Sequence, residues 1–149
     1  MIHFTRGDIF ESDCEVFVNP VNCVGVMGSG LAAAFKARFP NNFEIYYWAC
    51  KQHKVKVGAM HVVRAENRKN LRYLINFPTK LHWKDPSKIE YLLHGLTYLK
   101  DWIVREKIKS IALPKLGCGK GKLHWPLVKE VIEKILGDIP GVRIMVYSE

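Results

Sequence analysis

The sequence lacks the features that mark secreted, membrane-spanning or zinc-bound proteins. Its 149 residues include four cysteines, none of them in a Cys-x-x-Cys pair, so we expect neither disulfides nor a bound metal. No apolar run approaches the roughly 20 residues that span a bilayer. The amino terminus has no basic stretch followed by an apolar one, as a secretory signal has. These absences predict a soluble protein of the reducing cytoplasm with no membrane partner.

Acidic residues are also scarce, because 14 aspartates and glutamates stand against 23 lysines and arginines, for a formal net charge of +9. The excess is one-sided, with a net −2 on residues 1–50 and +11 on residues 51–149. A basic surplus attracts polyanions, either nucleic acid or a ligand with a pyrophosphate group. Solvated lysines that serve solubility alone are the alternative.

The sequence has no linker, repeat or low-complexity segment, and its length suits one domain with one core. Apolar runs that read as strands alternate with stretches that read as helices. We expect strands over residues 2–5, 16–19, 60–64, 72–76, 110–113 and 142–147, and helices over 31–38, from 41 or 42, over 89–106 and over 126–136. Apolar strands need helices on both sides, so the pattern predicts an α/β fold, a three-layer α/β/α sandwich with a mixed central sheet.

Local signals refine this expectation. The polar segment 66–70 predicts a hairpin turn between the third and fourth strands. Ser29 is placed to cap the helix that ends before Pro40. The segment 87–90, Ser-Lys-Ile-Glu, has the spacing of a capping box.

Lys80 is the most informative single residue, because it follows the apolar run 71–75 and the segment Asn-Phe-Pro-Thr. It therefore lies where a buried strand ends in a loop, and ligands bind at such strand ends in α/β sheets. A partly desolvated amine among other cations loses its proton more readily and can act as a nucleophile.

Two glycine-rich loops are expected at neighbouring strand ends. The first, within residues 19–30, leads into a helix amino terminus, and it matches neither a dinucleotide-binding fingerprint nor a phosphate loop ending in Gly-Lys-Ser/Thr. Anion binding and a plain tight turn are both open for it, and Asn22 can bind a ribose or hold the turn. The second, residues 117–122, carries two lysines, and an exposed loop with solvated lysines is its alternative. Together the two loops favour a diphosphate ligand.

Weaker candidates lie around these loops. Asp8 can accept a hydrogen bond from an adenine amino group beside the amide of Ile9, or it can be a turn residue. Tyr147 can stack on a base or pack in the core. For the aromatic residues just past Lys80 and past the second loop, packing is the safer interpretation; they are His82, Trp83, His124 and Trp125.

In this order the motifs resemble the macrodomains, a family that binds ADP-ribose. The resemblance spans nearly the whole chain through Gly7-Asp8-Ile9, residues 18–22, residues 25–30 and Gly117-Cys118-Gly119. Gly-Val-Met-Gly-x-Gly followed by Ala-Ala-Ala-Phe-Lys, the segment 76–80 and Leu-x-Trp at 123–125 are most similar to the branch of terminal ADP-ribose glycohydrolases. Within that branch the likeness is to antitoxins that remove ADP-ribose from thymidine in DNA.

The resemblance implies a single macrodomain over residues 1–149, with catalytic Lys80 and no cofactor. It implies that Asp8 and Ile9 hold adenine, that Asn22 holds the distal ribose, and that the two glycine-rich loops hold the diphosphate. The implied ADP-ribose contacts are Asp8, Ile9, Asn19, Asn22, Gly25, Val26, Met27, Gly28, Ser29, Gly30, Leu31, Thr79, Pro114, Leu116, Gly117, Cys118, Gly119, Lys120, Gly121 and Tyr147. The implied partners are ADP-ribose or ADP-ribosylated single-stranded DNA and a cognate ADP-ribosyltransferase toxin, for a monomeric protein.

One departure from the branch concerns the partner of the lysine. Its protein-directed members place an aspartate shortly after Gly-Cys-Gly, whereas this chain has Lys-Gly-Lys at 120–122 and no acidic residue between 116 and 129. Lysines suit a nucleic-acid strand, and we expect Lys115, Lys120 and Lys122 to lower the pKa of Lys80. Two alternatives remain: release of ADP-ribose from acidic protein side chains, and a non-catalytic reader of ADP-ribose, which has no obvious need of an amine at the distal ribose.

Overall fold

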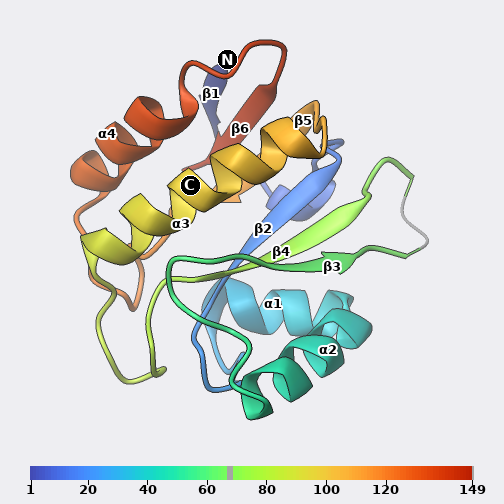
Figure 1. Ribbon diagram of the computed structural model, residues 1–149, viewed down its shortest axis with the longest axis vertical. Helices are drawn as coiled ribbons and strands as arrows, with labels where there is room; N and C mark the ends of the chain where they lie inside the picture. The colour runs from blue at the N-terminus through green and yellow to red at the C-terminus, as the bar shows by residue number, and fades with distance from the viewer. Residues whose placement is uncertain (67–68, 149) are drawn as a thin grey trace.

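The computed structural model describes residues 1–66 and 69–148 (Figure 1). A 3-10 turn, η1 (Ile9–Glu11), follows the first strand. The main elements are, in chain order, β1 (Ile2–Thr5), β2 (Val16–Val21), α1 (Gly30–Arg38), α2 (Pro40–Lys51), β3 (His61–Arg64), β4 (Tyr73–Pro78), α3 (Ile89–Arg105), β5 (Ser110–Pro114), α4 (Trp125–Leu136) and β6 (Arg143–Tyr147). Every expected helix and strand is present at close to its predicted bounds.

The strands form one mixed sheet in the order β1-β6-β5-β2-β4-β3. Only β3 is antiparallel to its neighbour, β4, so the expected hairpin is confirmed, although residues 67 and 68 of its predicted turn lie outside the described residues. The other pairs are parallel. The carboxyl ends of β1, β2, β4, β5 and β6 therefore meet at one side of the sheet, here called the carboxyl edge.

Helices cover both faces of the sheet, as the three-layer prediction requires (Figure 1). Successive residues of a strand point to opposite faces. Val16 and Val18 pack with Leu92 of α3 in one core cluster, whereas Phe17 packs with Phe35 of α1 in another. Among the described residues, no helix is both long and apolar enough to cross a bilayer.

Two strands include a proline that lies beyond their predicted ends. Pro20 lies inside β2 and Pro78 ends β4. The amide of Thr79 donates to the carbonyl of Val21 at 2.9 Å, so Thr79 and Val21 direct their backbone groups into the β2–β4 ladder. Because backbone groups alternate sides along a strand, the residues before them, Pro78 and Pro20, direct theirs away from this ladder. Neither proline breaks the sheet, because the ladders on those other sides have already ended.

The two predicted side-chain caps are absent. Ser29 is the N-cap of α1 by position, but its side chain makes no capping bond. The capping box at 87–90 is wrong, because the N-cap of α3 is Lys88. Ser87 is buried instead, its amide donates to the carbonyl of Gly121 at 2.9 Å, and its hydroxyl has no hydrogen-bond partner among the described residues. Ser87 therefore fastens the second glycine-rich loop rather than the helix.

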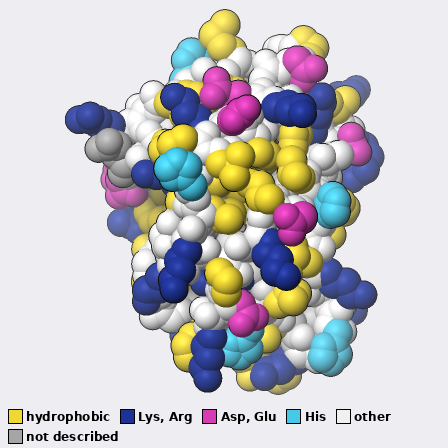
Figure 2. Space-filling view, turned by 90° about the vertical axis from the view of Figure 1, so that its left-hand side faces the viewer, with side chains coloured by type: hydrophobic (Ala, Val, Ile, Leu, Met, Phe, Trp, Pro, Cys, Tyr) yellow, Lys and Arg dark blue, Asp and Glu magenta, His cyan; other side chains and the backbone are white. Residues whose placement is uncertain are grey.

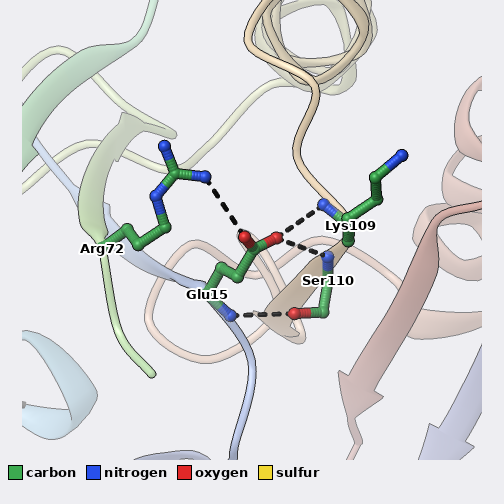
Figure 3. A network of polar contacts seen from close by, with 4 residues as sticks. All are labelled: Glu15, Arg72, Lys109 and Ser110. Carbon is green, nitrogen blue, oxygen red and sulfur yellow. Dashed lines mark hydrogen bonds and ion pairs between the residues drawn. The ribbon is translucent and has the colours of Figure 1, made fainter. Parts of the chain in front are cut away.

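A carboxylate ties three strands together at the amino end of the sheet (Figure 3). Glu15 accepts hydrogen bonds from the amides of Lys109 at 2.6 Å and Ser110 at 3.2 Å, and from the Arg72 guanidinium at 3.2 Å. Its own amide donates to Ser110 Oγ at 2.9 Å. These bonds join the starts of β2, β4 and β5.

Toward the carboxyl edge, β2 and β5 part. They are paired only at Val16 with Ile111 and at Phe17 with Ala112, whereas β2 pairs with β4 along its whole length. From β2 the chain first builds β3 and β4 on one side and then β5 and β6 on the other. The junction of β2 and β5 is thus a topological switch point, where open α/β sheets bind ligands.

We expect Glu15→Gln to lower the free energy of unfolding by about 1 kcal/mol at neutral pH, because charge-assisted bonds are lost at a site that solvent partly screens. Burial alone would raise the pKa of Glu15, but the Lys109 amide, the Arg72 guanidinium and the Ser110 amide together hold it below its usual value. The extra stability is therefore present above the unfolded-state pKa of about 4.3 and is lost as pH falls through the lower folded-state pKa.

Urea unfolding at neutral pH and at about pH 3 measures this effect, and the difference between wild type and Glu15→Gln should shrink at the acid value. Glu130→Gln, at an exposed position of α4, is the matched control and should leave stability unchanged. Equal unfolding free energies for wild type and Glu15→Gln at neutral pH would contradict a stabilising role for the hydrogen bonds that Glu15 accepts, here called the Glu15 clamp.

Candidate active site

The carboxyl edge brings together predicted site residues from five strands. Asp8 follows β1, Lys80 follows β4, and Tyr147 ends β6. The first glycine loop (residues 22–30) follows β2, and the second glycine loop (residues 116–122) follows β5. All of these segments therefore lie at one edge of the sheet, and the two glycine loops follow the neighbouring strands β2 and β5, as expected.

Backbone hydrogen bonds fix Lys80 beside the first glycine loop. The β2–β4 ladder continues beyond both strands: Thr79 donates to Val21 at 2.9 Å, and Cys23 donates to Leu81 at 3.0 Å. Lys80 lies between these two bonds, and its Nζ donates to the carbonyl of Trp83 at 3.4 Å. The backbone position of Lys80 is therefore set by the sheet.

The pKa of Lys80 is lowered, first by burial and then by the positive charge of Lys120, with a smaller contribution from Lys122. Of the three lysines expected to lower this pKa, Lys120 and Lys122 do so. The third, Lys115, has its Nζ over the ring of Trp125, 5.3 Å from the centroid. A larger fraction of the Lys80 amine is consequently neutral than in a free lysine.

Sequence reasoning missed Asp85, whose negative charge opposes this effect and raises the pKa of Lys80. The expected place for a carboxylate partner was the second glycine loop, which has none. Asp85 instead comes from the segment that carries Lys80, where its amide donates to the carbonyl of His82 at 3.0 Å. An acidic residue five positions after the lysine, in the same short loop, was the available signal.

Asn22 holds the first glycine loop. Its Oδ1 accepts from the amide of Val24 at 3.0 Å and from the hydroxyl of Tyr46 at 2.9 Å, and its Nδ2 donates to the carbonyl of Val26 at 2.8 Å. Of the two roles open to Asn22, the structure shows turn formation, and a ribose contact stays a prediction. Gly25 has a φ of +85°, which favours glycine.

Asn19 supports this loop from the core. It is wholly buried, and its Nδ2 donates to Asn76 Oδ1 at 3.2 Å and lies 3.7 Å from Met27 Sδ. Asn76 is in turn bonded to Asn42 of α2, at 3.0 and 3.1 Å. Asn19 and Met27 were expected among the ADP-ribose contacts, and both lie beneath the exposed glycines of the loop.

The second glycine loop is anchored at its ends and exposed in its middle. Leu116, Gly117 and Gly121 are buried, whereas Gly119 and Lys120 are exposed. Gly117 has a φ of +72° and accepts through its carbonyl from the amide of Leu123 at 2.9 Å. The part of this loop open to a ligand is therefore the backbone around Gly119.

Asp8 is a turn residue in the structure. Its Oδ1 accepts from the amide of Phe10 at 2.9 Å and caps η1, and its Oδ2 lies 3.9 Å from the Arg38 guanidinium. Ile9 is buried with Phe10, and Tyr147 packs partly buried on the same cluster. Contacts of these residues with adenine stay predictions.

The two cysteines in the glycine loops are poor nucleophiles. Burial raises the pKa of Cys23 to about 11 and also raises that of Cys118. The reactive form of a cysteine is its thiolate, which is scarce at neutral pH under these conditions. Neither thiol is therefore expected to act as the nucleophile at this edge.

Two hollows in the surface lie away from this set. One is lined by residues 10–13 and 69–71, before the amino ends of β2 and β4, and the other lies between α2 and His61. Neither contains a predicted site residue.

Comparison with known proteins decides the family, because the Macro domain model matches residues 18–132. The chain is a macrodomain. A DNA ADP-ribosyl glycohydrolase of Thermus aquaticus is 44% identical over 99% of this macrodomain, which covers 41% of that relative. The macrodomain of Mycobacterium tuberculosis DarG superposes with a TM-score of 0.97 at 42% identity, over 100% of this chain and 98% of that one.

A third relative is the Thermosipho africanus DarTG solved in complex with ADP-ribose. It has a TM-score of 0.92 at 31% identity, over 99% of this macrodomain and 41% of that chain. The macrodomain thus spans about two fifths of the length of the DNA ADP-ribosyl glycohydrolases that it matches, 41% and 42% for two of them.

We expect Gly121→Ala to disrupt the second glycine loop and Gly119→Ala to be tolerated. A Cβ on Gly121 would collide with Ser87 Oγ and would lie 2.5 Å from the carbonyl oxygen of Gly117, whereas a Cβ on Gly119 meets nothing within 4 Å. Overpacking of this kind costs about 1–3 kcal/mol. Urea unfolding and amide hydrogen exchange of the loop check the pair, and equal stability of the two variants would show that the loop is not anchored through Ser87.

Proposed function

We propose that this macrodomain is a glycohydrolase that removes ADP-ribose from thymidine bases of single-stranded DNA, with Lys80 as the catalytic residue. The observation that carries the proposal is a lysine of lowered pKa, held by the sheet beside one glycine loop and under the charge of another. Relatives 44% and 42% identical over 99% of the chain are named DNA ADP-ribosyl glycohydrolases, which supports the reaction and its class of substrate.

The two glycine loops would hold the diphosphate. Gly28, Ser29 and Gly30 are exposed at the amino end of α1, where free backbone amides and the helix dipole favour an anion. The backbone around Gly119 is exposed across the parting between β2 and β5. ADP-ribose laid across this parting would have adenine near Asp8 and the distal ribose near Lys80.

The chemistry assigned to Lys80 is nucleophilic. Its neutral amine attacks the anomeric carbon of the distal ribose and forms a C–N bond, while the glycosidic bond breaks and its electron pair leaves with the thymine, which takes up a proton. Water then cleaves the lysine adduct and releases ADP-ribose with the amine restored. The same amine can instead condense with the ring-opened aldehyde of the distal ribose to give an imine, which water hydrolyses. Borohydride reduces this imine, so a borohydride-stable adduct on Lys80 would favour a covalent route. A weaker alternative has Lys80 as an electrostatic anchor and water as the direct nucleophile.

A nucleic-acid substrate suits the charge of the site. Lys120 and Lys122 stand where the protein-directed enzymes are expected to carry an aspartate, and such lysines attract backbone phosphates. Figure 2 looks onto the side where α4 and the amino end of α3 lie in Figure 1, and lysine and arginine side chains lie there around a group of apolar side chains, together with acidic and histidine side chains.

We also propose a setting for this activity. The protein would act as an antitoxin in the cytoplasm, as a monomer, against a cognate ADP-ribosyltransferase toxin. A Thermosipho africanus relative, 33% identical over 98% of this chain, is named as a fusion of DNA ADP-ribosyl transferase and DNA ADP-ribosyl glycohydrolase, which supports the pairing.

Lys80→Ala should lower kcat on ADP-ribosylated thymidine oligonucleotides by at least about a hundredfold while ADP-ribose still binds, because the amine acts on the reacting atoms rather than on the diphosphate. Lys100→Ala, on α3 and paired with Asp138, is the control and should be fully active. The assay offers thymidine-linked and glutamate-linked ADP-ribose side by side to wild type and variants. Normal turnover by Lys80→Ala removes the catalytic assignment, and a preference for the glutamate-linked substrate removes the DNA assignment.

Two charge variants should move the pH profile in opposite directions. The active amine is neutral, so kcat/KM, which reports the free enzyme, should rise with pH and level off above the lowered pKa of Lys80. Lys120→Gln removes a positive charge that lowers this pKa and should move the rise to higher pH, whereas Asp85→Asn removes a charge that raises it and should move the rise to lower pH. Profiles of kcat/KM against pH measure both shifts, and shifts in the same direction would contradict the nucleophilic amine.

A further inference from the structure

Trp83 is an exposed aromatic residue beside the proposed catalytic lysine. Its side chain is 49% exposed, and its carbonyl accepts the hydrogen bond from Lys80 Nζ. Packing was the safer expectation for the aromatic residues near the two loops. The packing expectation holds for Trp125, which packs on the core with its ring centroid 6.2 Å from that of Phe4. The expectation is wrong for Trp83, which is exposed.

The ring of Trp83 lies between a histidine ring and a lysine amine. Its ring lies 5.3 Å from that of His82 at an interplanar angle of 34°, and Lys84 Nζ lies 5.2 Å from its centroid. The segment forms a turn in which the amide of Lys84 donates to His82 Nδ1 at 3.2 Å and that of Asp85 donates to the His82 carbonyl at 3.0 Å. An aromatic face next to lysines is the arrangement that binds single-stranded nucleic acids.

We propose that Trp83, together with Lys84, forms a stacking subsite for the nucleobase next to the modified thymidine. This deepens the proposed function and rests on it. The short link from Lys80 Nζ to the Trp83 backbone puts the indole within reach of a neighbouring nucleotide when the modified one is at the amine. A base on the indole takes the place of the Lys84 amine, which then moves to a backbone phosphate.

The exchange is favourable because a cation over an exposed aromatic ring is a weaker contact than a base stacked on tryptophan. The amine loses little, since a phosphate is a better partner for it than a ring. Stacking tolerates any base, because every base has a π face. The subsite would therefore distinguish a strand from a free nucleoside without reading its sequence.

The test compares two unmodified single strands of equal length, oligothymidylate and its abasic counterpart, which share phosphates and differ in bases. Binding is measured by fluorescence anisotropy at one fixed salt concentration, because phosphate contacts depend on salt. Wild type should bind oligothymidylate about tenfold more tightly than the abasic strand, and Trp83→Ala should lose this preference while its affinity for the abasic strand stays the same. Trp83→Phe should keep most of the preference.

Trp48→Ala, at a tryptophan of α2 that is 56% exposed, is the matched control and should behave as wild type. A base preference that persists in Trp83→Ala, or that is absent in wild type, overturns the subsite. Failure of the proposed function looks different: wild type would leave ADP-ribosylated thymidine oligonucleotides uncleaved while the base preference and its loss in Trp83→Ala remain.

Discussion

The clamp at Glu15 is the interaction on which the rest of the structure depends. A carboxylate that bonds to two amides of the β5 segment and to Arg72 holds the amino ends of the central strands together. Beyond those ends, only two residues of β2 pair with two residues of β5, and the two strands separate toward the carboxyl edge. The parting between the glycine loops thus lies at the end of the sheet opposite the Glu15 bonds.

The position of Lys80 follows from this arrangement rather than from contacts of its side chain. The ladder from β2 to β4 runs past the last strand residues, and the bonds at Thr79 and Leu81 enclose the lysine. The asparagines below, Asn19, Asn76 and Asn42, join the same two strands to α2 by buried amide bonds. Buried polar groups of this kind are costly unless they are paired, so they favour one relative position of strand and helix.

The fold and the position of the site could be predicted from the sequence because both depend on local patterns. Alternating apolar runs give the elements, and glycines after strands give the loops. The side-chain roles could not be predicted, because they depend on neighbours remote in sequence. Ser87 has the spacing of a cap but lies under Gly121, 34 residues later. The role of Asn22 is ambiguous from the sequence alone. The hydroxyl of Tyr46, in α2, donates to its side chain and helps to assign it to the turn.

The electrostatics of Lys80 changes when an anion occupies the glycine loops. In the free protein the positive charge of Lys120 lowers its pKa, and burial contributes more. A bound diphosphate is negative and would offset Lys120 and Lys122, so burial must keep the amine neutral in the complex. A DNA strand bound over Lys80, with one base stacked on Trp83, would exclude water from the amine and increase its burial. Substrate binding and activation of the nucleophile are then coupled through the same loop, residues 79–88, which carries the amine, Asp85 and the exposed indole.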